Sequence, residues 1–359
     1  MSGSDKVKRL FPGGNTSVGF YSYYQYVIDV KEANKVYFIK GGPGVGKSSM
    51  MKKVGQRMIE EGFDVEFHHC SADPDSIDAV VIPTFKIAMV DGTAPHVIDP
   101  KYPGAVDEII NLGEYWNEDA IRVNRDDIIT SIEANSNIYK RVYKYLGAAK
   151  LIHDDIEWIY NKAMDFNKLN DLSFEYLEDI FKGAKKQNKL SKVRHLFGSA
   201  YTHMGHIDYT ETFIGVMDNI HYIKGMEGTG KSTLLKKIAE RSIEFGYNVE
   251  VFHEPLEPIK IESVIIQELN LAITTNEKYK NREILNLVEL LDKNILDQYK
   301  DELNDSEELF EQMIEDARAN LVKSKINHDL IESYYIPNIN FEEINRVTAE
   351  VIAEILSNK

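Results

Sequence analysis

Nine residues near the beginning of the chain, Gly41-Gly42-Pro43-Gly44-Val45-Gly46-Lys47-Ser48-Ser49, match the Walker A pattern of Gly, four residues, Gly-Lys-Ser/Thr. The pattern occurs again 184 positions later, as Gly225-Met226-Glu227-Gly228-Thr229-Gly230-Lys231-Ser232-Thr233. Glycines in such a loop adopt backbone angles that other residues avoid, which lets consecutive N–H groups converge on phosphate oxygens. The sequence therefore predicts two nucleotide-binding units in tandem.

Both copies contain the residue types that hold a nucleotide. Lys47 and Lys231 would reach the β- and γ-phosphates, and Ser48 and Ser232 would each place a hydroxyl on Mg²⁺. The helix expected after each loop adds the positive end of its dipole. The candidate nucleotide-binding residues are Gly41, Gly42, Gly44, Val45, Gly46, Lys47, Ser48 and Ser49 in the first copy, and Gly225, Gly228, Thr229, Gly230, Lys231, Ser232 and Thr233 in the second.

The sequence around each loop supports the same prediction. Short apolar runs before the loops favour buried strands, and apolar residues recur at helical spacing after them until Gly62 and Gly246, where the helices should end. Residues 35–91 align without a gap to 219–275, with 21 identities in 57 positions. A repeat of that length indicates duplicated domains and not a solenoid.

Further apolar runs predict more strands, at 63–68, 79–82 and 87–90 in the first repeat. Strands that alternate with helices around a phosphate loop form a doubly wound parallel sheet. We therefore expect an α/β protein of two duplicated P-loop NTPase domains with parallel sheets, each followed by a helical segment. The expected domains are 1–192, with a proline-rich loop at 91–104, and 193–359, which is shorter and lacks that loop.

An aromatic leader precedes the loop-bearing strand of each repeat. Phe11 is followed by Tyr21, Tyr23, Tyr24 and Tyr26 in the first, and Phe197 by Tyr209 in the second. Such a leader could stack on the nucleotide base. It could instead form a β-hairpin packed on the edge of the sheet, which we favour.

The helical segments, at about 106–190 and 282–357, share the motif His-Asp-x-Ile-Glu-x-x-Tyr. In the first segment it places His153 and Glu157 one turn apart on a helix, and in the second His328 and Glu332. Such a pair could serve a metal or act as acid and base. The alternative, which we favour, is a relic of duplication on a packed helix, because one His and one Glu make an incomplete site.

Phosphoryl transfer also needs a carboxylate that holds Mg²⁺. Asp91 is the candidate, because it ends an apolar run in the manner of a Walker B strand; the alternative is an Asp that opens a turn. The second copy has Thr275 at this position, so we expect it to bind nucleotide with little or no hydrolysis. The alternative is that Glu257, which aligns with Asp73, compensates for the missing carboxylate.

Two more acidic residues follow the second strand of the first repeat. In P-loop kinases an acidic residue at this place receives the proton of the acceptor hydroxyl, so Asp73 or Asp75 could do so here or could activate water. The alternative is that Asp73-Pro74 merely initiates a turn. The candidate catalytic residues are therefore Lys47, Asp91, Asp73 and Asp75, and the candidate metal ligands are Ser48, Asp91 and Ser232.

Composition bounds the setting and the partners. The 359 residues carry a formal charge of −16, which disfavours nucleic acid through net repulsion. A single cysteine, Cys70, excludes a disulfide framework and favours a reducing compartment. The start of the chain lacks the apolar core of a signal peptide, and no run of 18 apolar residues occurs. We expect a cytoplasmic protein that does not enter a membrane.

With these features the chain resembles a group of tandem P-loop ATPase-like, ATP-binding proteins from Firmicutes. The likeness rests on the paired glycine loops and on two segments of the first repeat, 69–76 and 91–96, and it spans nearly the whole chain. It implies nucleotide binding in a bacterial cytoplasm. The glycine-loop motifs themselves predict ATP, or GTP, together with Mg²⁺. Three functions follow as alternatives: an ATPase active mainly at the first site, a kinase for a small acceptor or nucleotide, and a nucleotide-gated module, with an unknown protein partner, that does not turn over.

Overall fold

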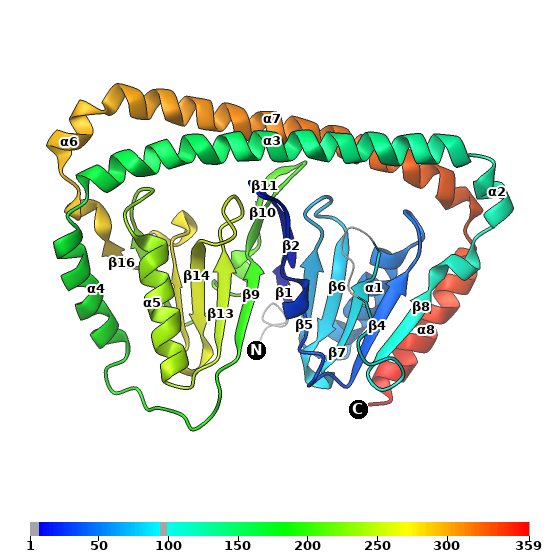
Figure 1. Ribbon diagram of the computed structural model, residues 1–359. Coiled ribbons are helices and arrows are strands. Elements are labelled where there is room, and N and C mark those ends of the chain that lie inside the picture. Colours follow the sequence, from blue (N-terminus) through cyan, green and yellow to red (C-terminus); the bar gives the residue numbers. More distant parts are fainter. Residues whose placement is uncertain (1–6, 94–98, 359) are drawn as a thin grey trace.

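The computed structural model describes residues 7–93 and 99–358. Two α/β halves stand side by side beneath a pair of long helices that run across both (Figure 1). The prediction for the proline-rich loop falls partly on residues 94–98, outside the described residues.

Each half contains one six-stranded sheet, and the two sheets have the same strand order. The first sheet runs β1 (Val7–Leu10), β5 (Val65–His69), β6 (Ile77–Ile82), β7 (Ile87–Asp91), β4 (Lys35–Lys40) and β8 (Asp107–Asn111). The second runs β9 (Val193–Phe197), β13 (Val249–His253), β14 (Ile261–Ile266), β15 (Leu271–Thr274), β12 (Asn219–Lys224) and β16 (Glu283–Asn286). The predicted α/β class and the duplication are confirmed by this repeated topology.

The sheets are mixed, so the prediction of parallel, doubly wound sheets is wrong. β6 pairs antiparallel with both β5 and β7, and β14 does the same with β13 and β15. The reason is the length of the connections, because a parallel crossover needs a dozen or more residues. Only residues 83–86 link β6 to β7, in a turn that Lys86 completes with a φ of 52°.

The helices that follow the glycine loops are α1 (Lys47–Glu60) and α5 (Lys231–Glu244). The apolar face of α1 buries Met50, Met51, Val54 and Met58 against its sheet. The chain leaves these helices at Gly62 and Gly246, which have φ angles of 92° and 79° that favour glycine. The predicted strand, loop and helix are confirmed in both halves.

The aromatic leaders form hairpins, the alternative that the sequence analysis favours. β2 (Gly13–Thr16) pairs with β3 (Gly19–Ser22), and β10 (Ser199–Thr202) pairs with β11 (Gly205–Asp208). The halves meet where the equivalent residues Phe11 and Phe197 exchange two backbone hydrogen bonds of 3.0 Å. Tyr23 is buried there, and its ring lies 5.1 Å from that of Phe197 and 4.7 Å from that of His253. These aromatic side chains join the two halves.

Two long helices connect the halves. α3 (Arg125–Ala163) leaves the first half and ends beside the second, and α7 (Lys300–Tyr335) runs alongside it in the opposite direction (Figure 1). With 39 and 36 residues they are each about 55 Å long. Short helices, α2 (Glu118–Arg122) and α6 (Lys293–Gln298), precede them.

The helix that follows each long helix covers the half to which the long helix has crossed. α4 (Phe166–Ile180) places Leu169 in the core of the second half, together with Leu234 and Ile238 of α5. α8 (Phe341–Leu356) places Ile344, Val351 and Ile355 in the core of the first half. We call α3 with α4 the first arm, and α7 with α8 the second arm; each arm completes the core of the opposite half.

This exchange predicts that a cavity in the second arm destabilises the first half. Ile355 is fully buried, so Ile355→Ala should cost about 2–5 kcal/mol of unfolding free energy. The measurement is urea unfolding followed by circular dichroism. Ile326→Ala is the matched control, since Ile326 of α7 is 65% exposed and should change the unfolding free energy by less than about 1 kcal/mol. Equal effects of the two substitutions would contradict the packing of α8 in this core.

Candidate functional site

The two glycine loops, residues 41–46 and 225–230, have closely similar conformations. Gly44 and Gly46 have φ angles of 68° and 95°, and Gly228 and Gly230 have 73° and 90°. In each loop the lysine that follows folds back over it. Lys47 Nζ donates to the carbonyl oxygens of Gly41 and Gly42 at 2.8 and 2.9 Å, and Lys231 Nζ makes the same two bonds to Gly225 and Met226.

The serines and the other predicted loop residues occupy equivalent places in the two halves. The Oγ of Ser48 accepts a hydrogen bond from the N–H of Ile77 at 3.0 Å, and that of Ser232 accepts from Ile261 at 2.8 Å. Each hydroxyl therefore faces the beginning of β6 or β14. Val45 and Thr229 are buried within their loops, whereas Ser49 and Thr233 are exposed at the first turn of α1 and α5.

Asp91 lies where a metal-holding carboxylate was predicted. It ends β7, which is the neighbour of β4, and its Oδ2 is 3.7 Å from Lys47 Nζ. Its Oδ1 accepts a 2.9 Å hydrogen bond from the N–H of Thr93, so the residue also opens a turn. Both interpretations of Asp91 fit this geometry, and the distance to Lys47 places its carboxylate at the first loop.

A second carboxylate at this edge, Asp78, was missed by the sequence analysis. β6 runs antiparallel to β7 with Ala79 paired to Val90, so Asp78 and Asp91 are the next residues along the two strands. Asp78 is buried, and its Oδ2 accepts a 2.5 Å hydrogen bond from Tyr24. Burial lowers the pKa of Lys47, while Asp91 and Asp78 act in the opposite direction. The sequence did contain a signal for Asp78, because it is an acidic residue inside an otherwise apolar run and the second repeat has Glu262 at the same position.

Asp73 and Asp75 lie in the turn between β5 and β6. Asp73 closes the turn, because its carbonyl accepts from the N–H of Ser76 at 2.8 Å and its carboxylate accepts from the hydroxyl of Ser76 at 3.2 Å. Its carboxylate also lies 3.5 Å from Lys325 of α7. Asp75 is exposed. The turn that the sequence suggested is therefore present, and Asp73 also contacts the second arm.

The corresponding edge of the second half differs in charge. Thr275 replaces Asp91, and its N–H donates a 3.0 Å hydrogen bond to the carbonyl of Glu262, the counterpart of Asp78. Burial raises the pKa of Glu262 to about 8, with further contributions from Asp208 and Glu254. Burial likewise raises the pKa of Glu254 to about 7. Two acids near the second loop are therefore substantially protonated at neutral pH.

Each glycine loop is covered by the arm that crosses from the other half. A methyl group added at Gly44 would lie 2.8 Å from Ile336, just after α7, and Gly42 faces Trp116 and Tyr335. At the second loop Gly228 lies against Glu157 and Asn161 of α3, too close for any side chain. The close approach explains why glycine is needed at Gly44 and Gly228 beyond their positive φ angles. It also makes both sites composite.

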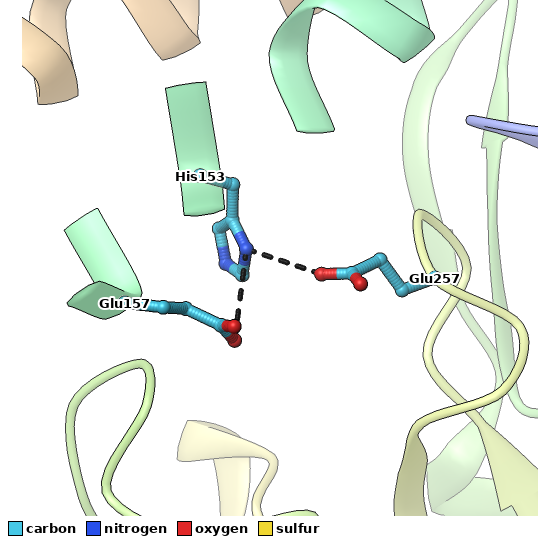
Figure 2. A group of neighbouring side chains, drawn as sticks. All are labelled: His153, Glu157 and Glu257. Atoms are coloured by element: carbon cyan, nitrogen blue, oxygen red, sulfur yellow. Dashed lines mark ion pairs between the residues drawn. The ribbon is translucent and has the colours of Figure 1, made fainter. Parts of the chain in front are cut away.

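The motif His-Asp-x-Ile-Glu-x-x-Tyr of each long helix therefore lies beside the glycine loop of the other half. At the second loop, His153 Nδ1 is 3.3 Å from Glu257 and 3.9 Å from Glu157 (Figure 2). Burial alone would lower the pKa of His153, but Glu257 and Glu227 raise it above its ordinary value. At the first loop His328, Asp329 and Glu332 form a similar but more exposed group.

Comparisons with known proteins give no relative for this chain. No protein-family model matches it, no curated protein is significantly similar to it, and no solved structure matches its fold significantly. Among residues 7–93 and 99–358, no helix is both long and apolar enough to cross a membrane. The chemistry of the site must therefore be inferred from its own residues.

The buried acid of the second half predicts a pH-dependent stability. Because the pKa of Glu262 is about 8 in the folded chain and about 4.3 when unfolded, the folded state binds the extra proton between these values. Stability should therefore fall as the pH rises from about 4.3 to 8. Glu262→Gln removes the contribution of this carboxyl and leaves that of Glu254, so the variant should be close to the parent in stability at pH 5 and exceed it at pH 8.5 by on the order of 2–4 kcal/mol.

Urea unfolding at the two pH values measures this difference. Glu268→Gln is the control, because the pKa of Glu268 is held below its ordinary value by Lys189 despite partial burial. Loss of that carboxylate should not stabilise the protein at pH 8.5. A Glu262→Gln variant with the same pH dependence as the parent would show that Glu262 is ionised in the folded chain.

Proposed function

We propose that the chain is a tandem P-loop ATPase that hydrolyses ATP mainly at the first glycine loop. The second loop binds nucleotide with little or no turnover. The observation that carries this proposal is the grouping of Lys47 with Asp91, 3.7 Å apart beside a glycine loop, where the second half has Thr275.

In this proposal the residues in and beside the first loop share the work of binding and cleavage. The N–H groups of residues 44–48 hold the phosphates, and Lys47 exchanges its two carbonyl partners for phosphate oxygens. Ser48 and Asp91 hold Mg²⁺, whose positive charge offsets that of the phosphates. Asp78 and Asp91 extend the same strand pair, and we infer that Asp78 orients the attacking water with Asp91.

The second loop lacks the residue that Mg²⁺ requires in this scheme. Thr275 offers a neutral hydroxyl, and Glu262 beside it is largely protonated at neutral pH because of its burial. Lys231 and Ser232 retain the positions of Lys47 and Ser48. These features support nucleotide binding without efficient cleavage, and they weigh against two equivalent active sites.

Phosphate release by the purified chain with ATP and Mg²⁺ tests the proposal. Lys47→Ala and Asp91→Asn should each lower the rate by about 100-fold or more, because they remove phosphate and metal contacts made in the transition state. Lys231→Ala is the matched control and should keep at least about half of the rate. Loss of activity in Lys231→Ala but not in Lys47→Ala would place turnover at the second loop and contradict the proposal.

Two further outcomes distinguish the alternatives. Turnover that appears only when a small hydroxyl acceptor is added would favour a kinase. Nucleotide binding without phosphate release under any condition would favour a binding module. Either result would overturn the assignment as an ATPase.

Nucleotide binding at the first loop can be followed by fluorescence, because one of the two tryptophans of the chain lies beside that loop. Trp116 lies against Gly42, and its ring is 5.9 Å from that of Tyr335. Trp158→Phe leaves Trp116 as the single reporter, and its fluorescence should change when ATP binds at the first loop. The change should disappear when Lys47→Ala is added and persist with Lys231→Ala. A signal insensitive to Lys47→Ala would place the nucleotide elsewhere.

A further inference from the structure

Three potential metal ligands from the two halves meet beside the second glycine loop. His153 and Glu157 lie one turn apart on α3, which has crossed from the first half, and Glu257 lies in the turn between β13 and β14 (Figure 2). One ligand atom from each lies within 4.8 Å of the others. The cluster forms only because the first arm packs on the second half.

The spacing of these atoms fits a small divalent ion. With bonds of about 2.0–2.2 Å, a tetrahedral zinc ion holds its ligand atoms about 3.3–3.6 Å apart. His153 Nδ1 is 3.3 Å from Glu257 Oε1 and 3.9 Å from Glu157 Oε1. The two carboxylates lie within 4.8 Å of each other, so movement of their side chains toward a shared ion would complete the arrangement and leave the fourth position open.

His153 is oriented so that one ring nitrogen faces both carboxylates. The residue is 8% exposed, and its Nδ1, which points between the two carboxylates, makes no hydrogen bond among the described residues. Its other nitrogen, Nε2, lies 3.7 Å from the carboxylate of Glu227 in the second glycine loop. Metal-bound histidines commonly direct the second nitrogen to a carboxylate in this way.

A positive charge already lies between the same two carboxylates. The ammonium group of Lys260 bonds to both Glu157 and Glu257, at 2.5 Å from the latter. Lys150 contacts Glu257 more distantly, at 3.7 Å. The first half has Ser76 at the position of Lys260, so this lysine is particular to the second half. It is attached by a flexible, partly exposed stem and can withdraw without disturbing the backbone.

We propose that His153, Glu157 and Glu257 bind a divalent transition metal ion such as Zn²⁺ or Co²⁺, and that Lys260 occupies its place when the metal is absent. The mixture of one imidazole and two carboxylates suits these ions better than Mg²⁺, which prefers oxygen ligands alone. The site joins the first arm to the second half beside Glu227. It does not depend on nucleotide, so it stands apart from the proposed ATPase function.

The test is a titration of the full chain, free of nucleotide and of any histidine tag, with Co²⁺ followed by visible absorption and with Zn²⁺ by calorimetry. We expect one metal ion to bind to each chain. His153→Ala should weaken binding at least about tenfold, because it removes a direct ligand. His328→Ala, the matched change at the first loop, should leave the affinity within about twofold.

Lys260→Met provides an independent readout that does not rely on loss of binding. It removes the competing ammonium while keeping an unbranched side chain, so the affinity for Co²⁺ should rise at least about tenfold. Circular dichroism confirms that each variant is folded. No binding by either the parent or Lys260→Met would overturn the proposal. Equal losses in His153→Ala and His328→Ala would overturn it as well.

Discussion

The structure depends on one packing interaction, which each arm makes with the half to which it crosses. The apolar face of the last helix of the arm is buried in the core of that half. Ile344, Val351 and Ile355 of α8 close the core of the first half, and Leu169 of α4 joins the core of the second. Removing such side chains from water is the largest favourable term in folding. The long helices α3 and α7 must therefore lie across both halves. The first half has a complete core only with the second arm, and the second half only with the first arm.

The composite character of both glycine loops is a consequence of this exchange. α7 ends against Gly42 and Gly44, and α3 lies against Gly228. Any movement of one loop must be accommodated by a helix whose other end lies beside the opposite half. In the first half the helix faces a loop with Asp78 and Asp91 at the sheet edge, and in the second it brings His153 to a loop that lacks an equivalent of Asp91. The duplicated scaffold thus holds two chemically different environments.

Much of this could be predicted from local patterns, and the rest could not. Strand, loop and helix around Lys47 and Lys231 follow from apolar periodicity and glycine positions, which are properties of neighbouring residues. Periodicity does not give strand direction, although the four residues between Ile82 and Ile87 were too few for a parallel crossover. Asp78 could have been noticed as a charge inside a buried run. The partner of an amphipathic helix is not encoded in its own pattern, so the crossing of α3 and α7, and with it the grouping of His153 with Glu257, emerged only from the tertiary packing.

The most direct measurement is a crystal structure of the chain with Mg²⁺ and a non-hydrolysable ATP analogue. We expect the triphosphate in the first glycine loop, the metal between Ser48 and the carboxylate of Asp91, and the end of α7 still packed on that loop. A structure in which the first loop is empty, or in which Asp91 points away from the metal, would contradict the assignment of this edge as the site of ATP cleavage.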